Sequence, residues 1–318
     1  MSLYPAFVPL VALLFAPGEI RQVPPKPDDE THVVIDEQKE RMTVPVEVAG
    51  AGPFRFIIDT GAERTVISRQ LAGRLGLPAG RDINVVAMTG RTRVGTVIIP
   101  SLRMATVPEV GVIHAPALDA IDLGGMGLLG IDTLQRHKVT IDFERQTMAV
   151  SPSVRRERGE RPAPGEVVVR AKTVFGQLIV TDAEVDGNKV RVVIDTGSPV
   201  SVGNHALRRI VMRRGGRLEP LEMTSATGGK LQTSYTYANR MRFGGVEFQG
   251  LPIAFADAPP FKYFGLDKKP AMLLGMSSLK FFRRVDIDFP NREVRFLLPR
   301  AEKMVIDCKV TMNGNCNA

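Results

Sequence analysis

The chain has 318 residues, of which 44% are hydrophobic and 24% are charged, and its formal net charge is +8. This composition is enough to bury two cores of ordinary domain size, and it excludes a disordered chain. Much of the positive excess lies at Arg155, Arg156, Arg158 and Arg161, in a stretch that also contains proline and glutamate. No nucleic-acid-binding motif accompanies it, so we expect a solvated linker there and no nucleic-acid partner.

The first 30 residues have the pattern of an export signal followed by a spacer. The run from Leu3 to Ala16 is apolar and uncharged, and residues 17–30 are rich in proline and charge. The run is too short and too interrupted by proline to predict a stable membrane span. One interpretation is the signal peptide of a periplasmic or secreted protein, although no Lys or Arg precedes the apolar run. The alternative is a misassigned start or a loose apolar tail.

Residues 31–151 are predicted to form a first β-rich lobe. Short alternating or β-branched runs are separated there by Gly, Pro, Asn and Asp, a pattern typical of strands and tight turns. A run at 44–48 leads through a glycine-rich turn into a run at 54–58, which ends at an Asp-Thr-Gly triplet, 59–61. The triplet is therefore expected at the end of the returning strand of a β-hairpin, where the acidic side chain projects just beyond the core.

Further features follow in the same lobe. A short helix is predicted at 71–75, a Gly-bearing hairpin turn at 87–91, and another short helix directly after the Leu-Leu-Gly motif at 128–130. An Ile-Asp-Phe motif at 141–143 comes last. Asp142 in this motif and Asp288 in its repeat are both expected to face solvent, because acids that alternate with apolar residues usually lie on the exposed side of a strand.

A linker is predicted at 152–165, because its prolines and dense charge leave little apolar surface to bury. The second lobe, 166–300, repeats the features of the first in the same order. It contains an Asp-Gly hairpin turn, an Asp-Thr-Gly triplet, a Gly-bearing turn, Leu-Leu-Gly with a short helix after it, and Ile-Asp-Phe. These lie at 186–187, 195–197, 225–230, 273–275 and 287–289.

The tail, 301–318, contains the only two cysteines, Cys308 and Cys316. They either form a disulfide in an oxidising compartment or remain free thiols. The four histidines are scattered, without the short spacings of metal ligands, so no metal is expected. A formal Gly-x-Gly-x-x-Gly match at 125–130 lacks a βαβ unit around it, and no cofactor is expected either.

The duplicated triplet suggests one active site built from two half-sites. The Thr and Gly after each Asp let the chain turn sharply, with its backbone amides close to the carboxylate. If Asp59 and Asp195 lie within hydrogen-bond distance, they cannot both ionise cheaply, and the pair holds one shared proton over a wide pH range. One carboxylate is then a base and the other an acid, which suits the attack of water on a peptide carbonyl.

The two copies resemble the retropepsin-like branch of the aspartic proteases. Phe-Ile-Ile-Asp-Thr-Gly-Ala with a later Gly-Leu-Leu-Gly, and Val-Val-Ile-Asp-Thr-Gly-Ser with a later Met-Leu-Leu-Gly, carry this resemblance in the two lobes. The resemblance implies an all-β, bilobal acid-protease fold. Its two retropepsin-like β-barrel lobes would be related by a pseudo-twofold axis, as in a fused dimer of bacterial type. Asp59 and Asp195 would be the catalytic dyad.

The resemblance also implies roles for the residues after each Asp. Thr60 and Thr196 would brace the two turns through their hydroxyls, and Gly61 and Gly197 would let the lobes approach each other. Because the residues that follow differ, Ala-Glu-Arg in one lobe and Ser-Pro-Val in the other, we expect an asymmetric site.

Members of the family close a hairpin flap over the substrate. The candidate flaps here are the turn with Thr89 and Gly90 in the first lobe and the turn with Gly228 and Gly229 in the second. Neither turn has a tyrosine at its tip.

We expect an aspartic endopeptidase that hydrolyses protein or peptide substrates, working as a monomer with an intramolecular pseudo-dimer. Two alternatives remain open. The chain could be a catalytically silent peptide-binding module with the same fold, although a binding groove has no need of two carboxylates that repel each other. It could also be active only when each lobe pairs with its twin in a homodimer.

Overall fold

The computed structural model describes residues 42–104, 107–153, 162–244 and 246–299. The predicted export segment, the arginine-rich centre of the linker, and the tail with Cys308 and Cys316 lie outside the described residues. Export and the disulfide therefore stay predictions. No helix in the described ranges is long and apolar enough to cross a membrane.

The described part of the first lobe consists mainly of short strands, with three short helices between them. In chain order these are β1 (Thr43–Val48), β2 (Ala51–Ile58), β3 (Val66–Ser68), α1 (Arg69–Arg74), β4 (Ile83–Ala87), β5 (Gly90–Val94), β6 (Thr96–Ile99), β7 (Leu102–Met104), β8 (Val107–Val110), β9 (Ile113–Leu118), α2 (Ala120–Leu123), β10 (Gly127–Leu129), α3 (Ile131–Leu134), β11 (His137–Asp142) and β12 (Thr147–Pro152).

The second lobe has the same character, with longer strands. Its elements are β13 (Glu166–Val174), β14 (Gln177–Val185), β15 (Asn188–Ile194), β16 (Val202–Gly203), α4 (His205–Val211), the 3₁₀ helix η2 (Met212–Arg214), β17 (Glu219–Thr224), β18 (Lys230–Phe243), β19 (Val246–Phe255), α5 (Pro259–Tyr263), β20 (Ala271–Leu274), α6 (Met276–Leu279), β21 (Arg284–Asp288) and β22 (Glu293–Leu297).

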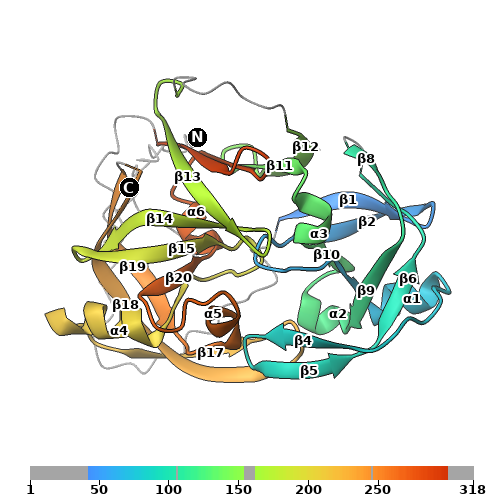
Figure 1. The fold of residues 1–318 in the computed structure, drawn as a ribbon, viewed down its shortest axis with the longest axis horizontal. Helices are drawn as coiled ribbons and strands as arrows, with labels where there is room; N and C mark the ends of the chain where they lie inside the picture. Colours follow the sequence, from blue (N-terminus) through green and yellow to red (C-terminus); the bar gives the residue numbers. More distant parts are fainter. Residues whose placement is uncertain (1–41, 105–106, 154–161, 245, 300–318) are drawn as a thin grey trace, which may run out of the picture. The chain divides into compact units, whose positions relative to one another are not determined.

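The strands form two large sheets, which confirms the predicted all-β, bilobal fold (Figure 1). The first sheet has the order β6-β9-β3-β10-β2-β1-β7-β8, and β4 and β5 form a separate hairpin. The second has the order β12-β11-β21-β22-β13-β14-β15-β20-β16-β19-β18-β17. Its first two strands, β12 and β11, come from the first half of the chain, so this sheet joins the two halves.

Both predicted hairpins before the triplets are confirmed. β1 pairs antiparallel with β2, and β14 pairs antiparallel with β15. Asp186 and Gly187 make the second turn with φ angles of 49° and 79°, in the left-handed region that these two residue types tolerate better than most. In β1, Val44, Val46 and Val48 are buried, as expected of a strand with one face on a core.

Each Asp-bearing strand ends beside a strand that carries Leu-Leu. β10 runs parallel to the end of β2, and β20 runs parallel to the end of β15. The backbone N–H of Asp59 donates to the carbonyl of Leu129 at 3.0 Å, and that of Asp195 donates to the carbonyl of Leu274 at 3.0 Å. The Leu-Leu-Gly motifs therefore fix the point at which each acidic residue leaves its sheet.

The predicted short helices are confirmed as α1, α3 and α6. Ser68 caps α1, and its Oγ accepts a hydrogen bond from the N–H of Leu71 at 3.1 Å. The sequence did not lead us to expect α4, although it carries the corresponding signal. Asn204 caps it by accepting from the N–H of Leu207 at 2.9 Å.

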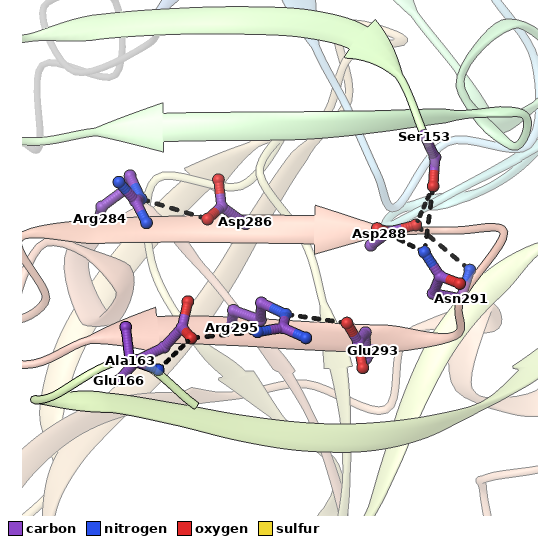
Figure 2. Close-up of polar contacts among 9 residues, drawn as sticks. All are labelled: Ser153, Ala163, Glu166, Arg284, Asp286, Asp288, Asn291, Glu293 and Arg295. Carbon is purple, nitrogen blue, oxygen red and sulfur yellow. Dashed lines mark hydrogen bonds and ion pairs between the residues drawn. The ribbon is translucent and has the colours of Figure 1, made fainter. Parts of the chain in front are cut away.

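The hairpin of β11 and β12 attaches the first lobe to the second. β11 pairs antiparallel with β21, so that Ile141 lies opposite Val285, and both side chains are fully buried. In the same sheet, Arg295 is 5% exposed and lies between two carboxylates, 3.0 Å from Glu166 and 2.8 Å from Glu293 (Figure 2). The two partners offset the desolvation of this buried guanidinium.

The Asp residues of the two Ile-Asp-Phe motifs do not both face solvent, so that expectation is wrong for Asp288. This residue is 2% exposed, and it accepts hydrogen bonds from Ser153 at 2.7 Å and from the side chain of Asn291 at 2.9 Å (Figure 2). The Ile-Asp-Phe motif predicts a strand, but it does not predict which segment packs beside that strand. Because β11 pairs with β21, the chain after β12 brings Ser153 over the carboxylate. Asp142, at the other motif, is half-buried.

Candidate active site

Two matched turns present the two acidic side chains of the triplets. Oδ1 of Asp59 accepts hydrogen bonds from the N–H groups of the second and third residues after it, both at 2.9 Å. Oδ1 of Asp195 does the same at 3.1 and 3.2 Å. Each carboxylate is thus held by its own turn, and N–H donors at one oxygen favour its charged form.

The two threonines join the turns to each other. Oγ1 of Thr60 donates to the carbonyl of Ile194 at 2.7 Å and accepts from the N–H of Thr196 at 3.1 Å. In the reverse direction, Oγ1 of Thr196 donates to the carbonyl of Ile58 at 2.7 Å and accepts from the N–H of Thr60 at 3.1 Å. Both threonines are 2% exposed, so four buried backbone groups depend on two hydroxyls.

The two glycines lie against the carboxylates of the opposite lobes. A Cβ atom added to Gly61 would lie 2.6 Å from Oδ1 of Asp195, and one added to Gly197 would lie 2.1 Å from Cγ of Asp59. Real Cβ atoms do not approach other atoms this closely. Only glycine therefore lets the two turns meet.

Asp59 and Asp195 line one cavity of about 200 Å³. Asp59 is half-buried and Asp195 is 8% exposed, so both carboxylates are partly withdrawn from water. The rest of the lining is mainly apolar and comes from both lobes. It includes Ile57, Leu118, Leu128, Met223, Phe264 and Leu273.

The two candidate flaps border this cavity. Met88 lines the cavity from the turn of β4 and β5, and Ser225, Ala226 and Thr227 line it from the turn of β17 and β18. The predicted flap residues Thr89, Gly90, Gly228 and Gly229 lie beside them and do not line it. The two turns also approach each other, because a Cβ on Gly229 would lie 2.5 Å from Oγ1 of Thr89. A Cβ on Gly228, whose φ is 81°, would lie 2.6 Å from Oδ2 of Asp122 in α2. The hairpin of the second lobe therefore reaches across to two elements of the first.

Comparison with protein-family models gives two matches in tandem. The family of gag-polyprotein putative aspartyl proteases matches residues 44–136, and an aspartyl protease family matches residues 180–278. The chain belongs to the aspartyl proteases. Each match contains one of the Asp-Thr-Gly triplets, so this is a tandem, two-lobe member with a retropepsin-like domain in each half. A comparison with curated proteins found no similar sequence.

A second repeated contact lies behind the triplets of this aspartyl protease, and the sequence reasoning missed it. Oγ1 of Thr65 accepts from the N–H of the glycine of Leu-Leu-Gly at 3.1 Å and bonds the hydroxyl of Thr133 at 2.6 Å. In the second lobe, Ser201 accepts from the corresponding glycine at 3.0 Å and bonds Ser278 at 2.6 Å. The signal was present, because both residues stand six positions after their Asp.

The flap of the second aspartyl protease domain has two tyrosines in its strands rather than at its tip. Tyr235 and Tyr237 lie in β18 and pack in one apolar cluster with Met88 of the other flap. Burial raises the pKa of Tyr237 to about 12, and it raises the pKa of Tyr235 as well. Both phenols therefore stay neutral at ordinary pH, where they can support the flap by packing and hydrogen bonding but supply no charge.

Proposed function

We propose that the chain is an aspartic endopeptidase in which Asp59 and Asp195 activate a water molecule for attack on a peptide bond. The observation that carries the proposal is the convergence of two equivalent turns, each with a carboxylate held by its own amides and packed against the glycine of the other. A protease function is what the two family matches support in general terms. The assignment of the dyad goes beyond them.

In this mechanism the two carboxylates share one proton, because two negative charges so close together in a partly desolvated site repel each other. The ionised carboxylate takes a proton from the water as the water attacks the carbonyl carbon. The protonated carboxylate donates its proton to the carbonyl oxygen, which gives a neutral gem-diol. Other aspartic proteases divide the roles of two carboxylates in the same way.

The rest of the site supports a peptide substrate in an extended conformation. The two hairpin turns border the cavity and approach each other at Thr89 and Gly229, so together they can cover a chain bound below them. Because the walls beside the dyad are mainly apolar, we expect apolar residues on both sides of the bond that is cut.

The test is hydrolysis of a denatured protein at mildly acidic pH, followed by mass spectrometry of the products. We expect Asp59→Asn and Asp195→Asn each to lose at least about a thousandfold in rate, because each removes the acid or the base. Asp82→Asn is the matched control, since this exposed carboxylate pairs with Arg93 and does not line the cavity. Full activity of either dyad variant would refute the mechanism.

The same experiments separate the alternatives. A peptide-binding module would bind the protein substrate without cleaving it, with or without the substitutions. A homodimer of paired lobes would show activity only in a species of twice the chain mass, which sedimentation of the active protein would detect. The reciprocal threonine bonds between the two halves of one chain favour the monomer.

A further inference from the structure

A second cavity of about 310 Å³ adjoins the dyad cavity on the side of the first triplet. The two cavities share part of their lining, including Gly61, Val86 and Phe264, so a peptide that passes the dyad reaches both. Two charged residues of the first lobe, Glu63 and Arg64, line the second cavity only. The charge of the cavity therefore lies at one wall, and the rest of its lining is uncharged, with apolar side chains such as Ile83 and Val85 beside the amides of Asn84 and Gln177.

The carboxylate of Glu63 is held in place from the other lobe. The hydroxyl of Tyr263, at the end of α5, donates to Oε2 of Glu63 at 2.9 Å, and this contact joins residues 200 positions apart. The ring of Tyr263 contacts the exposed ring of Phe175, with 4.9 Å between ring centroids. The hydrogen bond that Tyr263 donates to Glu63 raises the pKa of Tyr263, so the phenol stays a neutral donor. One oxygen of Glu63 is thus positioned by Tyr263, and the other is left for a further donor.

The corresponding wall of the second lobe has no such charge. The residues that follow Gly197 are Ser198, Pro199 and Val200, and the last two are buried. By the repeat, Pro199 stands where Glu63 stands in the first lobe. The two walls next to the dyad are therefore built on equivalent backbones, but only the wall of the first lobe carries a further carboxylate, that of Glu63.

We propose that this cavity is a subsite that selects a lysine or arginine side chain of the peptide substrate, with Glu63 as the specificity-determining residue. The inference rests on the proposed protease function. The aliphatic part of such a side chain would lie along Ile83 and Val85, and its charged end would meet the carboxylate of Glu63. The aromatic ring of Tyr263 adds an attractive surface for a cation.

Arg64, at the same wall, should affect the binding of a basic side chain in the opposite direction to Glu63. Its guanidinium has no hydrogen bond or ion pair with any residue in the described part of the chain. The positive charge of Arg64 repels a basic side chain in the subsite, so removal of this charge strengthens the selection for lysine or arginine. Removal of the Glu63 charge abolishes that selection. An acidic preference would require the reverse dependence on these two residues.

The test measures binding separately from cleavage. Fluorescein-labelled octapeptides with Leu-Leu at the centre carry either lysine or the uncharged norleucine at each flanking position in turn. Their affinities are measured by anisotropy with the Asp195→Asn variant, which binds without depending on turnover. At one position we expect lysine to bind about fivefold more tightly than norleucine, as for a partly exposed ion pair.

Glu63→Gln in the same background should remove this ratio, and Arg64→Gln should increase it. Glu109→Gln, on the exposed side of β8, is the matched control and should leave the ratio unchanged. A ratio near one at every position, or a ratio unaffected by Glu63→Gln, overturns the subsite. If the unsubstituted protein cleaves the peptides without selectivity, the protease function is supported and the subsite is overturned. If it binds lysine selectively but cleaves nothing, the subsite is supported and the protease function is overturned. Absence of binding by every peptide would overturn the subsite, whereas the protease function is tested separately by hydrolysis of the denatured protein.

Discussion

Replacement of Thr196 by valine tests whether the two hydroxyls hold the turns together. Valine has almost the same shape as threonine, so the substitution removes the hydroxyl without creating a cavity. Two hydrogen bonds to backbone groups are lost, the one donated to the carbonyl of Ile58 and the one accepted from the N–H of Thr60. Ile58 is fully buried and Thr60 is 2% exposed, so water does not replace the hydroxyl easily.

The expected loss follows from the two groups left without partners. Each buried backbone group without its hydrogen bond costs about 1–3 kcal/mol, so Thr196→Val should lower the free energy of unfolding by about 2–6 kcal/mol. Thr196→Ser keeps the hydroxyl and loses one methyl group, which costs about 1 kcal/mol. The valine variant should therefore be clearly less stable than the serine variant, although its side chain is larger and more apolar.

Urea unfolding followed by circular dichroism measures the difference. With a slope of about 3 kcal/mol per M, a loss of about 3 kcal/mol moves the midpoint by about 1 M. Thr236→Val is the matched control, because this threonine is 3% exposed and its hydroxyl makes no hydrogen bond to the residues that the structure describes. If Thr196→Val unfolds at the same urea concentration as Thr196→Ser, the hydroxyl does not hold the turns, and the reasoning is wrong.

Two further predictions concern the glycines and the buried tyrosines. Gly197→Ala should abolish peptide hydrolysis in a protein that still folds, because the added Cβ would lie 2.1 Å from Cγ of Asp59. The test measures hydrolysis and checks folding by circular dichroism. A folded variant that is active would contradict the geometry. The unfolded chain loses the Tyr237 proton near pH 10 and the folded chain near pH 12, so the folded state binds more protons between these values and stability falls as pH rises through them. Tyr237→Phe should make this fall smaller in urea midpoints measured from pH 9 to 12, and equal falls would show that Tyr237 does not contribute.

The parts of the site that the sequence predicted are those with local signals. An apolar run that ends in Asp-Thr-Gly specifies both a strand and the turn after it, and Asp186-Gly187 specifies a tight hairpin. The repeat then predicted that Asp59 and Asp195 share one active site, because two copies of a half-site imply a single site. The short helices after Leu-Leu-Gly followed from the same repeat.

The parts that the sequence did not predict depend on pairing between distant segments. The burial of Asp288 results from β11, which belongs to the other half of the chain, and the contact of Glu63 with Tyr263 spans 200 positions. Neither leaves a periodic pattern in the sequence around it. The Thr65 and Ser201 pair was missed for a different reason, because the two lobes use different residues for the same hydroxyl.

The contacts also explain why the triplets are alike in the two lobes while the residues just after them differ. Each threonine bonds a backbone carbonyl of the opposite lobe, so a change in one lobe leaves a buried group without a partner in the other. Glu63 is exposed, and among the residues that the structure describes its side chain bonds the other lobe only through the hydroxyl of Tyr263, so its replacement leaves no buried group there unpaired. The backbone of the dyad is therefore constrained to be symmetric, and the walls next to it are free to become different for the two ends of a peptide.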